Sequence, residues 1–151
     1  MTGTEMQGQI QRIVNDVSAT AWTPTQYLEA INYAIRYVSK KRIDKNDMEF
    51  IFDLSVVNGQ VVPDNFERFA GTVPVTIKDT GLQRQFFYTG STMPTVRYYV
   101  MRPVLTSLAD TIPFKGSHTE AVKLAAAIYL KEQRGIFDMK NEKERLAELL
   151  A

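Results

Sequence analysis

The stretch WTPTQYLEAINYAIRYVSKKR, residues Trp22–Arg42, decides the fold because its local signals all predict one helix. Thr23 can cap the helix, and Gln26, three residues later, completes a capping box. Pro24 falls at the first helical position, where its missing N–H costs nothing. Apolar side chains then recur at helical spacing: Leu28, Ile31, Ile35 and Val38, with Tyr27 and Ala34 beside them. We expect this helix to be the spine of the core.

A second, shorter helix is predicted upstream of the spine. Residues 5–18 form an amphipathic pattern with one apolar face, made of Ile10, Ile13, Val14 and Val17. Between the two helices, Trp22 and Tyr27 have the spacing of a hydrophobic staple, which fixes how the chain enters the spine. We expect the two helices to pair as a helical hairpin.

Alternating apolar and polar residues replace the helical period after the spine. Residues 48–56 predict a half-buried strand, and Asn58-Gly59 predicts a type I′ turn that returns residues 60–62 as its partner. Residues 64–69 suggest a capped turn that presses two Phe rings onto the sheet. Residues 71–78 and 95–101 alternate as further strands, with a turn at residues 79–81. Because hairpin turns join these segments, the sheet should be antiparallel.

The last third of the chain is predicted to be mostly helical. Residues 103–116 are too apolar for a solvated linker and should lie against the core. Ser117 and Glu120 suggest a second capping box, and the Ala-rich helix that follows ends at Gly135. A strongly charged segment closes the chain. The predicted fold is α+β: one domain, residues 1–151, in which a helical bundle (a helical hairpin plus C-terminal helices) carries an inserted antiparallel β-sheet at about 48–101 and a C-terminal arm at about 138–151.

The balance of charges argues against a dedicated DNA-binding protein. The chain has 18 basic and 17 acidic side chains, so no global field gathers nucleic acid or an anionic membrane. Its lack of cysteine excludes disulfides and zinc–thiolate sites. No apolar run approaches the length of a transmembrane helix, and the first residues lack the pattern of a signal peptide. We expect a protein without a membrane partner.

The sequence offers little chemistry for catalysis. His118 is the only histidine, and it follows a predicted helix start, where a structural role is commoner than a catalytic one. The carboxylates Asp53, Asp64, Asp79 and Asp110 lie in turns or on polar strand faces, where capping is the usual role. No phosphate-binding or dinucleotide-binding glycine pattern is present. We expect no enzyme activity, no catalytic residue, no cofactor and no metal.

Two groups of residues around the spine helix are candidates for contacts. The basic cluster of Lys40, Lys41, Arg42 and Lys45 is either a solvated helix end or a surface that faces phosphate. Tyr33 and Tyr37, four residues apart, belong either to the edge of the core or to an interface.

Four strings in succession carry a resemblance: YLEAINYAIRYVSKKR (residues 27–42), VVPDNFERF (61–69), YYVMRPVLTSLADTIPF (98–114) and HTEAVKLAAAIYL (118–130). Their order, after a short helix and around a Phe-rich strand, resembles the head-to-tail adaptor (connector) proteins of tailed bacteriophages. The resemblance covers about residues 5–135. The strings are packing motifs rather than chemical ones, so the resemblance rests on their succession.

This resemblance implies a structural protein of the virion neck, assembled in the host cytoplasm. Family members form a ring, expected to be a dodecamer, beneath the portal protein. The ring extends the channel through which DNA passes without specific binding, and it gives a tail nozzle or tail tube protein its platform. On this reading the basic cluster faces the lumen, and Tyr33 and Tyr37 lie between subunits.

The C-terminal segment 141–151 has two interpretations. It is too short to be a stable helix alone, so the apolar stripe of Leu146, Leu149 and Leu150 needs a partner surface. That surface is either the protein's own core, or the portal or a neighbouring subunit, against which a segment that is mobile in the free protein becomes ordered. The resemblance implies the portal, because C-terminal arms of the family reach it. Other functions stay open at this point: a tail-completion or other neck protein, a weak nucleic-acid-binding module, or a small hydrolase.

We predict that the protein binds duplex DNA weakly and without sequence preference, because its charge is balanced and no basic and aromatic side chains interleave as a reading surface. Fluorescence anisotropy with unrelated duplexes over a range of salt concentrations tests this. Tight binding that depends on sequence would contradict it.

Overall fold

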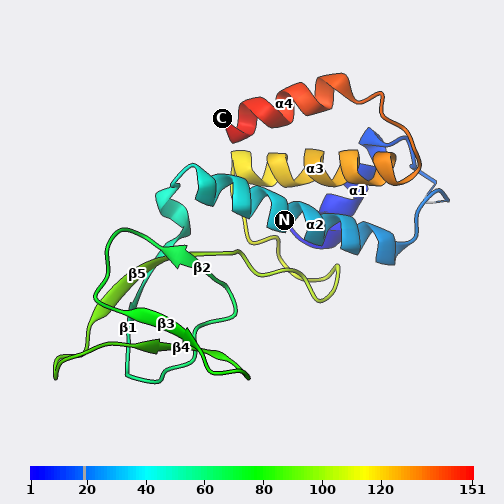
Figure 1. The fold of residues 1–151 in the computed structure, drawn as a ribbon. Helices are drawn as coiled ribbons and strands as arrows, with labels where there is room; N and C mark the ends of the chain where they lie inside the picture. Colours follow the sequence, from blue (N-terminus) through cyan, green and yellow to red (C-terminus); the bar gives the residue numbers. More distant parts are fainter. Residues whose placement is uncertain (19) are drawn as a thin grey trace. The chain divides into compact units, whose positions relative to one another are not determined.

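The chain folds into two compact units, and a computed structural model describes residues 1–18 and 20–151 (Figure 1). The helical unit comprises Met1–Arg42 and Arg102–Ala151, and the sheet unit comprises Ile43–Met101. The described residues form an α+β fold, as predicted. Its helices pack together, and the segment that forms a small antiparallel sheet is inserted between them in the sequence. The helices are α1 (Gly3–Ile13), α2 (Pro24–Asp44), α3 (Ser117–Gln133) and α4 (Lys140–Leu150).

Helix α3 is the centre of the helical unit, since α1, α2 and α4 all pack against it. Figure 1 shows α3 between α2 and α4. Its small side chains allow this close approach on several sides, because Ala121, Ala125, Ala126 and Ala127 are all buried. The spine predicted from sequence, α2, is therefore one of the helices around α3 rather than the central one.

The start of α2 is as the sequence predicts. The backbone N–H of Thr23 donates to Gln26 Oε1 at 2.8 Å, and the N–H of Gln26 donates to Thr23 Oγ1 at 3.3 Å. The rings of Trp22 and Tyr27 meet edge to face at 6.3 Å, which confirms the staple. The predicted apolar face is buried except for Leu28, which is half-buried.

Helix α1 is shorter than the predicted span of residues 5–18. It begins with a capping box between Thr2 and Glu5 and ends at Ile13, because Asn15 takes the left-handed conformation at φ +58°. Val17, predicted on the buried face, is 76% exposed. The chain turns here so that the carboxylate of Asp16 is buried instead.

Asp16 organises the loop between α1 and α2. Its Oδ1 accepts the N–H groups of Thr20 (2.9 Å) and Ala21 (2.8 Å), and its Oδ2 accepts the hydroxyl of Tyr27 at 2.8 Å and the N–H of Trp22 at 3.3 Å. Burial opposes ionisation of Asp16, but these hydrogen bonds together hold its pKa below the ordinary value. Tyr27 in turn has a raised pKa, chiefly from burial and then from Asp16.

The segment before α3, residues 103–116, belongs to the helical unit and packs on its core, as predicted. Leu105, Ile112 and Phe114 are buried. Asn32 of α2 clamps this segment, because its Nδ2 donates to the carbonyl of Leu105 at 2.9 Å and its Oδ1 accepts the N–H of Leu105 at 2.8 Å. The predicted capping box at Ser117 is wrong. Gly116 is the N-cap, at φ +55°, and makes no side-chain cap, while Glu120 pairs with Lys123.

The sheet unit holds a three-stranded and a two-stranded antiparallel sheet. The first has the order β1-β5-β2, with Ile51 opposite Tyr99 and Ser55 opposite Thr95 in the β1–β5 pair. The buried core of the sheet unit, which both sheets share, is Val56, Val62, Phe66, Val75, Phe86, Val96, Tyr98 and Val100. The strands are β1 (Ile51–Ser55), β2 (Phe66–Phe69), β3 (Thr76–Asp79), β4 (Arg84–Phe87) and β5 (Thr95–Val100).

The hairpin predicted at Asn58-Gly59 is wrong. A type I′ turn needs positive φ at both central residues, and only Gly59 of this pair has it, at +81°. The side chain of Asn58 instead bridges to Tyr88, accepting its N–H at 2.8 Å and donating to its carbonyl at 3.0 Å. Strand β1 therefore pairs with β5, and Val61 makes only an isolated bridge to Gln85.

Other strand bounds also differ from the expectation. Met48–Phe50 is a 3₁₀ turn capped by Asp47. Only residues 76–78 of the predicted strand at residues 71–78 lie in a strand, and that strand, β3, continues to Asp79, which was predicted to begin the turn. The segment predicted as a capped turn contains β2, although the rings of Phe66 and Phe69 do pack together, with centroids 5.1 Å apart. The strand predicted at residues 95–101 is confirmed as β5.

We predict that Asp16→Asn lowers the melting temperature by several degrees at neutral pH, because an amide cannot accept four hydrogen bonds as the carboxylate does. Because the pKa of Asp16 is lower in the folded state, its carboxylate stabilises the fold at pH values above 3.8, the ordinary pKa of an aspartate. This contribution is lost as the pH falls through the pKa of the folded state. The difference from wild type should therefore shrink in acid. Thermal unfolding between neutral and acid pH measures it, with the exposed Asp64→Asn as control.

Candidate interaction groove

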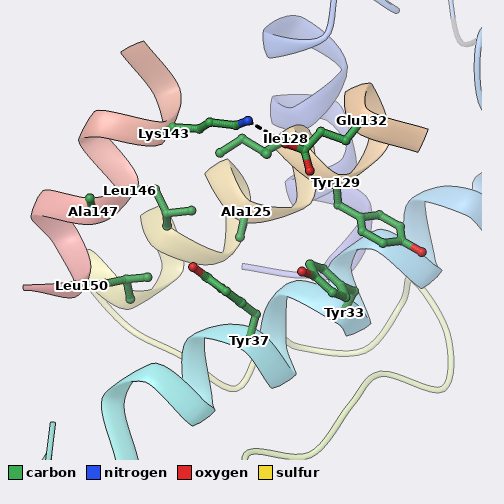
Figure 2. A pocket seen from close by; sticks show the side chains of 10 residues that line it. All are labelled: Tyr33, Tyr37, Ala125, Ile128, Tyr129, Glu132, Lys143, Leu146, Ala147 and Leu150. Carbon is green, nitrogen blue, oxygen red and sulfur yellow. Dashed lines mark ion pairs between the residues drawn. The ribbon is translucent and has the colours of Figure 1, made fainter. Parts of the chain in front are cut away.

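An apolar groove of about 280 Å³ lies between α2, α3 and α4. Figure 2 shows side chains from all of these helices around it, with Ala125 of α3 between the tyrosines of α2 and the leucines of α4. We call this surface the α4 groove, and its lining residues are Tyr33, Tyr37, Ala125, Ile128, Tyr129, Glu132, Lys143, Leu146, Ala147 and Leu150.

One wall of the α4 groove is a stack of tyrosines. The ring of Tyr33 stacks on Tyr129 with centroids 4.4 Å apart and on Tyr37 with centroids 6.1 Å apart. Lys41 Nζ then lies 5.7 Å from the centroid of the Tyr37 ring, a cation–π distance. Tyr33 is nevertheless 45% exposed, so this stack presents aromatic surface to solvent.

The hydroxyl of Tyr33 stays protonated at neutral pH. Its partial burial raises its pKa, and Tyr37, Glu132 and Tyr129 raise it further. This wall therefore presents an apolar ring with an uncharged hydroxyl group, which suits a contact surface that is partly exposed to water.

The opposite wall comes from α4. Leu146 and Leu150 are 8% and 7% exposed and pack toward α3, while Ala147 leaves space between them and the tyrosines. Lys143 of α4 pairs with Glu132 of α3 at 2.6 Å, and both side chains remain partly exposed (Figure 2). Exposed ion pairs of this kind contribute little, so the leucines hold α4 in place.

The structure brings together two groups that the sequence left separate. Tyr33 and Tyr37, the predicted interface pair, face the same groove as Leu146 and Leu150 of the predicted portal-docking arm. Leu149, the third residue of that arm, is half-buried and does not line the groove. In the structure the arm is helix α4 and packs on α3. Whether it also docks on a portal stays a prediction.

The predicted basic patch lies at and after the end of α2. Lys40, Lys41 and Lys45 are exposed and Arg42 is partly exposed. Lys41 continues the tyrosine stack through Tyr37. The assignment of this patch to a DNA-facing lumen stays a prediction.

His118 lies in the first turn of α3, in the helical unit. Its side chain is 9% exposed and meets the ring of Phe114 edge to face at 6.2 Å. Among residues 1–18 and 20–151, no group of three His, Cys, Asp or Glu side chains is arranged to hold a metal ion. No helix in this part of the chain has the length and apolarity needed to cross a bilayer.

Sequence reasoning missed Tyr129 and Ala147 as groove residues. Both lie on helices whose facing partners the sequence did not identify. Tyr129 could have indicated the groove, because it is a large aromatic residue in an otherwise Ala-rich helix.

Comparison with known proteins adds no assignment. No protein-family model matches the chain, and a search of curated proteins finds no match.

We predict that Leu146→Ala destabilises the protein by about 2 kcal/mol, as expected for truncating a buried leucine. Leu149→Ala, on the same helix but only half-buried, is the matched control and should cost less than about 1 kcal/mol. Urea denaturation of both variants measures the difference. Equal effects would mean that α4 does not hold this packing in solution.

Proposed function

We propose that this protein is a structural virion protein, a head-to-tail adaptor. It forms a ring under the portal, extends the DNA channel and provides the attachment platform for the tail. Its partners are the portal protein, a tail nozzle or tail tube protein, and further copies of itself. Its place is the neck of the virion.

The observation that carries the proposal is that segments resembling adaptor proteins pack against one another in the helical unit. Residues 27–42 lie in α2, and residues 118–130 lie in α3. Asn32, in the first of these strings, binds both backbone groups of Leu105 in the string 98–114. Three of the four strings therefore contribute to one packing arrangement, while residues 61–69 lie in the sheet unit, and this shared packing supports reading the three as a single resemblance.

The α4 groove also supports a role in assembly. It exposes stacked tyrosines beside leucines, and aromatic residues are enriched in the cores of protein interfaces. An adaptor needs such contact surfaces for its neighbours in the ring and for the proteins above and below it.

We predict that the free chain is monomeric or weakly associated and that it forms rings when mixed with its cognate portal. Light scattering after size exclusion measures the free state, and negative-stain microscopy of the mixture shows whether rings stack on portals. Mixtures without stacked rings would contradict the adaptor function, and a stable ring at micromolar concentration without portal would contradict the predicted order of assembly. Salt-sensitive retention of DNA at physiological ionic strength would favour a nucleic-acid-binding module.

A further inference from the structure

The pair Asn58-Gly59 combines the two features that favour spontaneous deamidation of an asparagine. The side chain of Asn58 ends in a carboxamide, and the next residue has no side chain to shield its backbone nitrogen. No other asparagine of the chain precedes a glycine. Asn58 is exposed, so water reaches its carboxamide. This pair is therefore the position in the chain at which the reaction is chemically easiest.

The reaction needs no reagent other than water. The backbone nitrogen of Gly59 loses its proton and attacks Cγ of Asn58. A bond between this nitrogen and Cγ forms, the bond between Cγ and Nδ2 breaks, and ammonia leaves with the displaced proton, so that a cyclic imide remains. One water molecule then opens the ring. Addition at one carbonyl of the imide gives aspartate, and addition at the other gives isoaspartate.

In the folded protein, hydrogen bonds hold both reacting groups in other contacts. Asn58 Oδ1 accepts the N–H of Tyr88 at 2.8 Å, and Asn58 Nδ2 donates to the carbonyl of Tyr88 at 3.0 Å. The N–H of Gly59, which must lose its proton, donates to the carbonyl of Phe86 at 2.8 Å. The reaction therefore requires that the carboxamide turn away from Tyr88 and that Gly59 separate from Phe86.

These contacts belong to a turn, residues 57–60, that lies beside β4. The N–H of Gln60 donates to the carbonyl of Val57 at 3.0 Å, and the N–H of Phe86 donates to the carbonyl of Gln60 at 2.8 Å. Gln85 Nε2 donates to the carbonyl of Gly59 at 2.8 Å. Opening of the turn breaks several of these bonds together, so we expect the open form to be a minor population of the folded protein.

We propose that Asn58 is a deamidation site that the folded sheet unit suppresses, and that its product weakens the turn that suppresses it. At neutral pH a carboxylate at position 58 accepts hydrogen bonds but donates none, so the bond to the carbonyl of Tyr88 is lost. Isoaspartate also lengthens the main chain within the turn. Because the turn covers the outer edge of β4, deamidation loosens that edge. This inference does not depend on the adaptor function.

Mass spectrometry of proteolytic peptides measures deamidation at position 58. The full chain is incubated at one mildly alkaline pH and one temperature, folded in buffer or unfolded in guanidinium chloride. The folded protein should react at least roughly tenfold more slowly, since three hydrogen bonds must break before the attack. Equal rates in the folded and the unfolded chain would overturn the proposal.

The variant Gln85→Ala tests the turn without denaturant. It removes the hydrogen bond to the carbonyl of Gly59, so it should raise the rate in the folded protein roughly fivefold and leave the rate in guanidinium chloride unchanged. Gln83→Ala is the matched control, because Gln83 is exposed and lies two positions away. Circular dichroism checks that both variants fold. A rate for Gln85→Ala no higher than that of the control would overturn suppression by the turn.

The variant Asn58→Asp reproduces the aspartate product. It should lower the melting temperature by several degrees at neutral pH, because the donor to the carbonyl of Tyr88 is lost. Asn65→Asp adds the same charge at another exposed asparagine of the sheet unit and should have a smaller effect. Equal melting temperatures of these two variants would overturn the proposed effect of the product.

Discussion

The helical unit depends on how the chain returns to it after building a separate sheet unit. The segments Met1–Arg42 and Arg102–Ala151 belong to one unit although residues 43–101 lie between them in sequence. Asn32 and Ser39 of α2 fix the return. Asn32 binds both backbone groups of Leu105, and Ser39 Oγ accepts the N–H of Arg102 at 3.3 Å. A buried backbone segment must pair its polar groups, and here two side chains on one helix provide the partners.

This clamp sets the position of α3, and α3 sets the rest of the helical unit. The crossing that Asn32 holds leads directly into α3, against which the other helices pack. Small side chains at the centre allow short distances between helices, and large ones such as Tyr129 then project at the edge of the contact. The groove beside α4 follows from this difference in size, since Ala125 and Ala147 leave space next to Tyr33 and Leu146.

Features of the fold that depend on neighbouring residues could be predicted from the sequence. The capping box of Thr23 and Gln26 and the staple of Trp22 and Tyr27 involve residues within one turn or two, and both are present. Features in which a distant contact competes with a local motif for the same side chain could not be predicted. Asn58 binds Tyr88, thirty residues away, and Glu120 pairs with Arg145 of α4, besides its local pair with Lys123, rather than closing a capping box. In each case a local motif was present, and a tertiary contact used its side chain.

The same distinction explains what the sequence showed of the candidate site. Tyr33, Tyr37, Leu146 and Leu150 could each be chosen as contact residues from their size and spacing, but only the packing of α2 and α4 around α3 places them along one groove. The groove has no charge cluster or glycine pattern by which a sequence motif could reveal it. The groove is defined by its shape and its apolar lining. Tyrosine rings stack with centroids 4.4 and 6.1 Å apart on one side, leucines lie on the other, and alanines lie between them. A surface of this kind is suited to recognising another apolar side chain, and the specificity then comes from the rigidity of both partners rather than from hydrogen bonds.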